Sequence, residues 1–277
     1  MSSLDHSQET VLVTGASSGI GAEFARQLGA RGSDLVLVAR RVDRLETLAA
    51  EIRTTRRVRV EVIAADLAVD APGERLLART AERGITVTSV VNNAGAGLWA
   101  RFADSDPAQL RQMVALNATA VLDISRAFLP AMLQRQAGYL LNVTSLAAYS
   151  SIPMQGAYSA AKAFVLSFTE ALWAETRGSG VRVLALAPGV TTSEFFDVIN
   201  TDDPAVHAGR AQTPAQVVDI GLRTLDRRDP PPSRISGHLN HAIAVVPRYL
   251  TRRRAVLLTA ANTMRNASAS APDVAAT

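Results

Sequence analysis

The stretch at residues 11–21, VLVTGASSGIG, decides the fold class of this 277-residue chain. Its apolar start is typical of a short buried strand, and a helical pattern continues from the glycines as far as Arg31. A strand, a glycine-rich turn and a helix form the first part of a βαβ unit. Glycines let the backbone approach a pyrophosphate, which binds the N–H groups at a helix N-terminus. The spacing is GxxxGxG rather than the common GxGxxG, so a plain glycine-rich connection is the alternative.

Strands and helices alternate along the rest of the chain. This alternation predicts an α/β fold, a Rossmann-type doubly wound parallel sheet in three αβα layers, as one domain with a helical C-terminal extension. Further strands are expected at 35–39, 58–64, 86–91, 139–143, 181–187 and 232–237, and helices at 106–132, 155–177 and 213–227. We assign 1–8 to a flexible N-terminus, 9–237 to the Rossmann domain, 238–266 to the extension and 267–277 to a disordered tail.

The composition argues against several classes of protein. The chain has no cysteine, so it forms no disulfides or thiolate metal sites, and its 4 histidines lack metal-ligand spacing. No apolar signal region opens the chain, and no stretch approaches about 20 uninterrupted apolar residues, so we expect a cytoplasmic protein. The net charge is +4, but the arginines are scattered and only 5% of residues are aromatic, which argues against nucleic-acid binding.

Tyr158 and Lys162 lie one turn apart on a predicted helix, and hence on one of its faces. An ammonium group near a phenol lowers the pKa of that phenol from about 10. Tyr158 could then exchange a proton with a carbonyl or alcohol oxygen near neutral pH. Ser145 follows the apolar run YLLNV at a predicted strand end, from which its hydroxyl can reach the same oxygen. Because YxxxK is a common pattern, an ordinary surface helix is the alternative.

Arg40 and Arg41 follow the second predicted strand. Dinucleotide-binding folds that use NAD carry an acid there for the ribose 2′-hydroxyl, whereas an arginine suits a 2′-phosphate. A guanidinium group matches phosphate geometry with paired N–H donors. We therefore favour NADP(H) over NAD(H). The alternative is that both arginines only begin a solvated helix.

Polar and small residues follow the other strands, at the edge of the sheet where such folds bind ligands. Asp66 could accept a hydrogen bond from an adenine amino group or cap the next helix. Residues 92–95, NNAG, would leave room for ribose and nicotinamide, or their amides could bond loop backbone. Asn117 lies in the apolar middle of the helix at 106–132, where Asn is disfavoured. It is either structural or organises backbone and water near Lys162.

The order of these motifs resembles the short-chain dehydrogenase/reductase family over roughly residues 9–200. TGASSGIG looks like its glycine-rich turn, ADL (65–67) and NNAG (92–95) like its adenosine-pocket and sheet-edge motifs, and APGVTTSEF (187–195) like its segment that binds the nicotinamide carboxamide. The family's catalytic tetrad is matched by Asn117, Ser145, Tyr158 and Lys162.

The resemblance implies a role for each of these four residues. Tyr158 would be the general acid/base and Ser145 a donor to the substrate oxygen. Lys162 would bind the ribose hydroxyls and tune the tyrosine pKa, and Asn117 would hold a water that links Lys162 to solvent. The resemblance also implies transfer of the 4-pro-S hydride. The expected cofactor-binding residues are Gly15, Ser17, Ser18, Gly19, Ile20, Gly21, Arg40, Arg41, Asp66, Leu67, Asn92, Asn93, Ala94, Gly95, Tyr158, Lys162, Pro188, Gly189, Val190, Thr191 and Ser193.

The candidate substrate pocket is mostly apolar, as ligand pockets usually are. No charged residue adjoins Ser145 or Tyr158 in sequence, so we expect a neutral, fairly hydrophobic ketone, aldehyde or secondary alcohol as substrate of an NADP(H)-dependent carbonyl reductase or alcohol dehydrogenase. A 3-ketoacyl (acyl-carrier-protein or CoA) reductase and a non-catalytic NADP-binding sensor or scaffold are the alternatives. The pocket residues are Leu98, Trp99, Leu146, Ala147, Met154, Phe195 and Phe196.

Two segments outside this core carry further predictions. Residues 193–212 are expected to form a mobile cover over the site. The extension at 238–266 is longer than the short terminus that packs across the tetramer in many relatives, so a homodimer is as well supported as a tetramer. Its Arg252, Arg253 and Arg254 suggest weak contact with a membrane surface, with a helical cap on the domain as the alternative.

Overall fold

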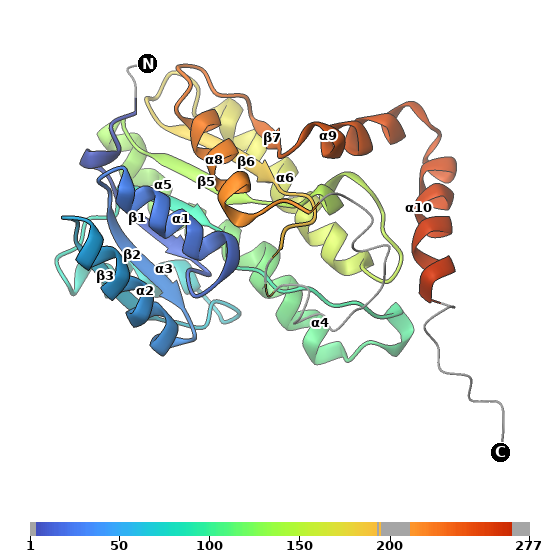
Figure 1. Ribbon diagram of the computed structural model, residues 1–277, viewed down its shortest axis with the longest axis horizontal. Coiled ribbons are helices and arrows are strands. Elements are labelled where there is room, and N and C mark those ends of the chain that lie inside the picture. The colour runs from blue at the N-terminus through green and yellow to red at the C-terminus, as the bar shows by residue number, and fades with distance from the viewer. Residues whose placement is uncertain (1–3, 193, 195–210, 268–277) are drawn as a thin grey trace.

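The structure is a computed structural model that describes residues 4–192, 194 and 211–267. A sheet of 7 strands, all parallel, forms its centre in the order β3-β2-β1-β4-β5-β6-β7 (Figure 1). The order reverses between β1 and β4, and ligands of such sheets bind in the crevice at this switch point. The strands are β1 Thr10–Thr14, β2 Asp34–Ala39, β3 Val60–Ala64, β4 Ser89–Asn92, β5 Tyr139–Val143, β6 Arg182–Ala187 and β7 Ser233–Ile235.

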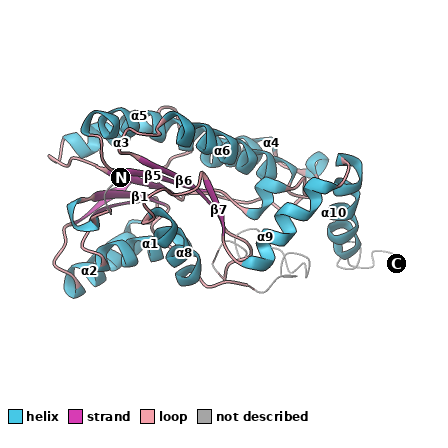
Figure 2. Ribbon diagram, turned by 90° about the horizontal axis from the view of Figure 1, so that it is seen from above, coloured by secondary structure: helices cyan, strands magenta, loops and turns pink. Residues whose placement is uncertain are grey.

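Helices cover both faces of the sheet, which confirms the predicted three-layer α/β fold (Figure 2). A parallel sheet covered on both faces needs strands that are apolar throughout, and Val11, Leu12 and Val13 of β1 are all fully buried. One face carries α1 Gly19–Ala30, α2 Val42–Thr55 and α8 Pro214–Leu225, and the other carries α3 Pro72–Ala81, α5 Ala120–Arg135 and α6 Gly156–Glu175.

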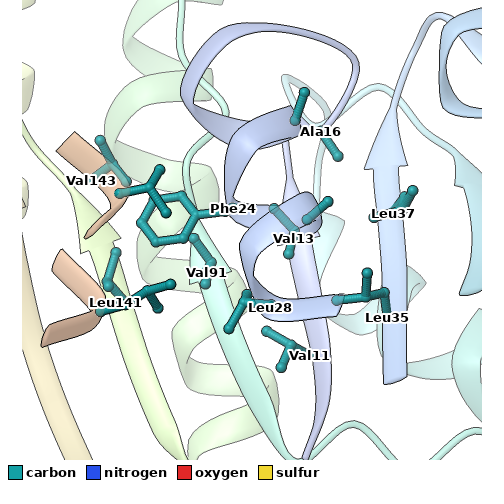
Figure 3. Close-up of a cluster of buried hydrophobic side chains, with 14 of the residues drawn as sticks. Val11, Val13, Ala16, Phe24, Leu28, Leu35, Leu37, Val91, Leu141 and Val143 are labelled. Atoms are coloured by element: carbon teal, nitrogen blue, oxygen red, sulfur yellow. The ribbon is translucent and has the colours of Figure 1, made fainter. Parts of the chain in front are cut away.

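The core on the α1 face fixes the direction in which the glycine-rich turn leaves the sheet. Phe24 and Leu28 lie one helical turn apart and are fully buried against the sheet (Figure 3). Their neighbours in this core include Val13 of β1, Val91 of β4 and Val143 of β5. This packing holds the N-terminus of α1 directly beyond the carboxyl end of β1.

The helix expected over residues 106–132 is interrupted. Asp106 caps α4 Pro107–Val114 and accepts a hydrogen bond from Ala108 N at 2.9 Å. A π-helical turn, Ala115–Thr119, then separates α4 from α5, which continues to Arg135. A π turn adds a residue to the turn and is frequent at functional sites. Apart from Asn117 the segment stays largely apolar through this turn, so its hydrophobic pattern does not distinguish a π turn from a continuous α-helix.

The segment Pro107–Arg135 is long and apolar enough to cross a membrane by length and composition alone. In the folded chain α5 packs against α3, β4 and β5, and its Phe128 and Met132 are buried in the core. Core helices of globular domains meet the same criterion, and this packing accounts for the apolar character of the segment.

The start of the described chain packs against the domain, whereas its end forms helices beyond the sheet. Residues at the start, expected to be flexible, include a short 3-10 turn, His6–Gln8, whose buried His6 bonds Asp226 at 2.8 Å. After β7 come α9 His238–Val245, a 3-10 turn at Val246–Tyr249 and α10 Arg252–Ala267. Helix α10 stands at the end of the molecule beyond α4 and α6 (Figures 1 and 2).

Candidate active site

A large cavity opens at the carboxyl ends of the strands, around the switch point between β1 and β4. Its volume is about 910 Å³, toward the upper end of the roughly 300–1,000 Å³ typical of ligand pockets. The predicted residues that line it are Gly15, Ser17, Ser18, Gly19, Ile20, Arg40, Arg41, Asp66, Leu67, Asn93, Ala94, Gly95, Trp99, Asn117, Ser145, Leu146, Ala147, Tyr158, Lys162, Pro188, Gly189, Val190 and Thr191.

Asn92, a predicted cofactor-binding residue, does not line this cavity. Its side-chain amide donates to Asn142 Oδ1 at 2.9 Å and lies 3.3 Å from Ser125 Oγ, so it joins β4 to β5 and to α5 inside the sheet. The strand was predicted to end at residue 91, but β4 continues through Asn92, so this side chain lies within the sheet rather than at its edge. Gly21, another predicted cofactor-binding residue, is not part of the cavity lining and packs against the Gly15 carbonyl instead.

Leu98 and Met154, predicted for the substrate pocket, do not line the cavity either. Leu98 packs on the apolar cluster that includes Met113 and Tyr158, so it supports the tyrosine from outside. Met154 has a left-handed backbone (φ 68°), and its carbonyl accepts a hydrogen bond from Ala100 N at 3.1 Å. Ser193, Phe195 and Phe196, which were also predicted to belong to the site, lie outside the described residues, as does most of the expected cover at 193–212.

The glycine-rich turn is packed too closely to accept larger side chains. Thr14 Oγ1 accepts hydrogen bonds from the backbone N–H groups of Asn93 and Ala94, both at 3.0 Å, which ties the turn after β1 to the loop after β4. Gly15 has a φ of +67°, and a Cβ on Gly21 would lie 2.2 Å from the Gly15 oxygen. Only glycine fits this contact, which explains the final glycine of the GxxxGxG spacing.

We expect Gly21→Ala to lower the free energy of unfolding by about 2 kcal/mol, because overpacking against backbone cannot relax cheaply. Urea titration followed by circular dichroism measures the change. Gly156→Ala is the matched control, since a Cβ there meets nothing within 4 Å. Equal stability of the Gly21 and Gly156 variants would show that the turn can shift.

The N-terminus of α1 is built to hold an anion. Among the described residues no side chain caps this helix at Ser18, so its first N–H groups face the cavity without a side-chain acceptor from them. Backbone donors and the helix dipole at such an end favour phosphate. This cradle and the glycines around it fit the pyrophosphate of a dinucleotide.

Ser145 and Tyr158 meet in the cavity. Ser145 begins a 3-10 turn, Leu146–Tyr149, and its hydroxyl oxygen accepts from Ala147 N at 3.1 Å, which fixes the side chain. The Ser145 and Tyr158 side chains are hydrogen-bonded to each other. Tyr158 is 8% exposed, so the little surface it retains is directed at the cavity that it lines.

Lys162 and Asn117 lie deeper in the same cavity. Lys162 Nζ donates to Val143 O at 3.1 Å and is 5.8 Å from the centre of the Tyr158 ring. The Asn117 amide donates to Ala96 O at 2.7 Å and Met113 O at 2.9 Å. Its buried Oδ1 has no hydrogen-bond partner among the described residues, and it is aimed, like Lys162 Nζ, at the space beside Gly95.

The pKa values of the two titratable groups move in opposite directions. Burial raises the pKa of Tyr158 to about 12, and its hydrogen bond with Ser145 acts against that rise. Burial lowers the pKa of Lys162 to about 8. The depressed tyrosine pKa expected from the sequence is therefore not found in the protein alone, because desolvation outweighs the lysine, whose own charge is disfavoured in the same buried site.

The arginines after β2 make different contacts from those expected. Arg40 is exposed and lines the cavity. The Arg41 guanidinium donates to Ser17 Oγ at 3.0 Å, to Ser18 Oγ at 2.8 Å and to Glu194 Oε2 at 3.0 Å. Arg44, on α2, donates to the same carboxylate at 2.6 Å. These contacts lower the pKa of Glu194 and join the end of the segment after β6 to the turn after β1.

The fold and the cavity together define a dinucleotide-binding protein of the Rossmann class. A sequence model described as short chain dehydrogenase matches residues 9–204. The chain belongs to this family and is a short-chain dehydrogenase/reductase, an oxidoreductase that uses a nicotinamide cofactor.

Three similar proteins illustrate the range of the family. A very-long-chain 3-oxoacyl-CoA reductase of Mycosarcoma maydis is 32% identical over 78% of this chain, which spans only 61% of that relative. Sulfoacetaldehyde reductase 2 of Chromohalobacter salexigens is 35% identical over 76% of this chain and 85% of its own length. The structure of a short-chain dehydrogenase from Sphingobium yanoikuyae in complex with NADPH has a TM-score of 0.75 and 30% identity, and the match covers 97% of this chain and 98% of that chain.

The sequence missed the part of the cavity wall that comes from the C-terminal extension. Only the excess length after β7 could have drawn attention to this region, because nothing local connects it with the strand ends. Its lining residues are Ala242, Ile243, Val246, Pro247, Leu258, Thr259 and Thr263.

Proposed function

We propose that the protein is an NADP(H)-dependent carbonyl reductase or secondary alcohol dehydrogenase that acts on a neutral, fairly hydrophobic ketone, aldehyde or alcohol. One observation carries the proposal: the hydrogen-bonded hydroxyls of Ser145 and Tyr158 face a cavity whose walls beside them are apolar. Hydrophobic walls with a few convergent polar groups are what a small neutral carbonyl compound requires.

The residues in the cavity support the following steps for ketone reduction. Bound NADPH would supply the hydride for the carbonyl carbon. Ser145 donates a hydrogen bond to the substrate oxygen, and Tyr158 transfers its proton to that oxygen as the alcohol forms. Lys162 can supply a proton near neutral pH because its pKa is about 8. Asn117 holds its unpartnered Oδ1 toward the same space, where a water can relay that proton.

The same geometry supports a site for each part of the cofactor. The N-terminus of α1 would bind the pyrophosphate. Asp66 would accept a hydrogen bond from the adenine, and residues 188–191 would bind the nicotinamide carboxamide. A 2′-phosphate would lie among Ser17, Arg40 and Arg41, where two guanidinium groups and a hydroxyl are available. This arrangement, with the NADPH-bound relative, supports NADP(H) over NAD(H).

Glu194 lies where it would compete with that phosphate for Arg41. We expect Glu194→Gln to tighten NADPH binding by about two- to fivefold, the range for loss of exposed ion pairs, and to leave the Kd for NADH unchanged. Cofactor fluorescence titrations at low and high salt measure both values. Glu46→Gln, which removes an ion pair with Arg53, is the control. Weaker NADPH binding in the Glu194 variant would mean that this carboxylate supports the cofactor site.

A screen followed at the NADPH absorbance tests the proposed activity. We expect oxidation of NADPH with aryl, cyclic and long-chain methyl ketones, faster than with NADH. A 3-ketoacyl thioester reductase, the second candidate, is favoured by the name of the M. maydis relative. Turnover of acyl thioesters but not of free ketones would replace our proposal with that one.

The remaining expectations stay predictions. A homo-oligomer, dimer or tetramer, is measured by light scattering, and a cytoplasmic location by cell fractionation. A sensor or scaffold without turnover is disfavoured because the chain is a family member that retains Tyr158 and Lys162 in one cavity.

A further inference from the structure

The cavity does not end at the reaction centre. It continues from Ser145 and Tyr158 to the C-terminal extension, where α9 contributes Ile243, the following turn Val246, and α10 contributes Leu258, Thr259 and Thr263. These residues lie on elements that the sequence analysis treated as a cap or a membrane contact. Their place in the cavity wall gives the extension a role in the site itself.

Helix α10 presents one face to the cavity and another to solvent. Thr263 is only 5% exposed, whereas Leu257 is 57% exposed and does not line the cavity. Leu258 is 52% exposed yet belongs to the lining, so part of its open surface faces the cavity. Helix α10 makes few backbone contacts with the other described elements, and a helix of this length is marginally stable without packing. An apolar ligand in the cavity would provide that packing.

The chemistry of the α10 face is apolar and lacks free donors. Thr259 Oγ1 donates to Ala255 O at 3.0 Å, and Thr263 Oγ1 donates to Thr259 O at 2.9 Å. Both hydroxyl hydrogens are thus used within the helix, which leaves methyl groups and oxygen lone pairs for a ligand. This part of the wall can pack against hydrocarbon, but it cannot donate a hydrogen bond to an anion.

In the described part of the cavity wall, positive charge lies away from α10. Among the described lining residues the only cations are Arg40 and Arg41, near the start of α1, and Lys162 at the reaction centre. The arginines at 252–254 begin α10 but are exposed and are not part of the lining. A carboxylate, sulfonate or phosphate held against Leu258 would therefore lose part of its hydration without gaining a cation from the described lining residues.

We propose that α10 is the far wall of the substrate site and selects ketones or secondary alcohols with a long, uncharged hydrocarbon body. The proposal rests on the carbonyl reductase function above and specifies its substrate class. The reacting oxygen lies at Ser145 and Tyr158, and the hydrocarbon body extends over Ile243 and Val246 to Leu258 and Thr263. Small ketones leave this wall uncovered, and ketones with a remote acidic group place that charge against it.

Three ketones isolate the effect of the wall. The first, 2-decanone, has a long uncharged body; 9-oxodecanoate has the same chain with a carboxylate at its far end; and 2-butanone is too short to reach α10. We expect the wild-type kcat/KM for 2-decanone to exceed both others by at least tenfold. Turnover of 2-butanone with no preference for 2-decanone would refute the role of α10 alone. No turnover of any ketone would refute both the proposed function and the role of α10.

Two neighbouring leucines provide the matched variants. Leu258→Arg should lower the ratio of kcat/KM for 2-decanone to that for 9-oxodecanoate by at least tenfold, because it places a cation in the wall. Leu257→Arg adds the same charge on the solvent side of the same helix and should leave that ratio unchanged. Circular dichroism and melting temperatures establish that both variants fold. Equal ratios in both variants, whether shifted or not, would contradict the proposal.

Discussion

Tyr158→Phe is expected to reduce kcat/KM for ketone reduction by at least about 10³-fold, within the range attributed to positioned proton donors. The substitution removes the hydroxyl that bonds Ser145 and keeps the ring that packs in the cluster with Met113 and Ala147. The fold and the cofactor site should survive, so the Kd for NADPH should change by less than about twofold. Steady-state kinetics and cofactor fluorescence separate the two effects.

The control for this variant is Tyr249→Phe, because Tyr249 is 86% exposed in the turn before α10 and does not line the cavity. Its kinetics should match the wild type. Near wild-type turnover by the Tyr158 variant would remove the tyrosine from the reaction and leave Ser145 or water as the proton donor. Loss of NADPH binding along with turnover would instead mean that the hydroxyl serves the cofactor.

The elements closest to the reaction follow from local sequence patterns. The turn at 14–21 is determined by glycines whose neighbours leave no room for a Cβ, and the strands around it by unbroken apolar runs. Tyr158 and Lys162 share a helix face because of their spacing alone. Such short-range constraints explain why the α/β fold was predicted correctly and why most of the expected site residues line one cavity.

Contacts between distant segments could not be predicted in this way. The ion pairs of Glu194 with Arg41 and Arg44 join residues about 150 positions apart, and the place of Leu258 in the cavity depends on how α9 and α10 leave β7. The π turn that holds Asn117 is equally invisible, because the apolar pattern continues through it. These features depend on contacts between segments far apart in the chain, which the local spacing of residues in the sequence does not reveal.

Lys162 is the second residue for which we expect a large effect. It is the only lysine in the chain, while the other 28 of its 29 basic residues are arginines. Arginine stays charged at any working pH, whereas a buried lysine shifts its pKa readily. The amine at this position is therefore a cation that can lose its proton near working pH, which an arginine could not do. Lys162→Arg and Lys162→Met should both lower kcat/KM by at least about 10²-fold.

The same lysine should make stability depend on pH. Its pKa falls from 10.5 in the unfolded chain to about 8 in the folded protein. Between these values the unfolded chain binds more protons, so stability rises with pH across this window and is lost as pH falls through the folded pKa. We expect the free energy of unfolding of the wild type to gain about 2 kcal/mol between pH 7.5 and 10, relative to Lys162→Met. The rise of the Tyr158 pKa to about 12 opposes this trend only above pH 10.

Because the chain has a single lysine, its titration can be observed directly. Protein labelled with ¹³C at the lysine ε-carbon should give one side-chain signal that titrates near pH 8, and urea unfolding should move that midpoint to above pH 10. Lys162→Met removes the signal and confirms its assignment. A midpoint near 10 in the folded protein would show that the amine reaches water, and the proton relay through Lys162 would then lose its physical basis. A midpoint near 8 would instead show that burial disfavours the charged amine and leaves, beside Tyr158, a group that titrates near working pH.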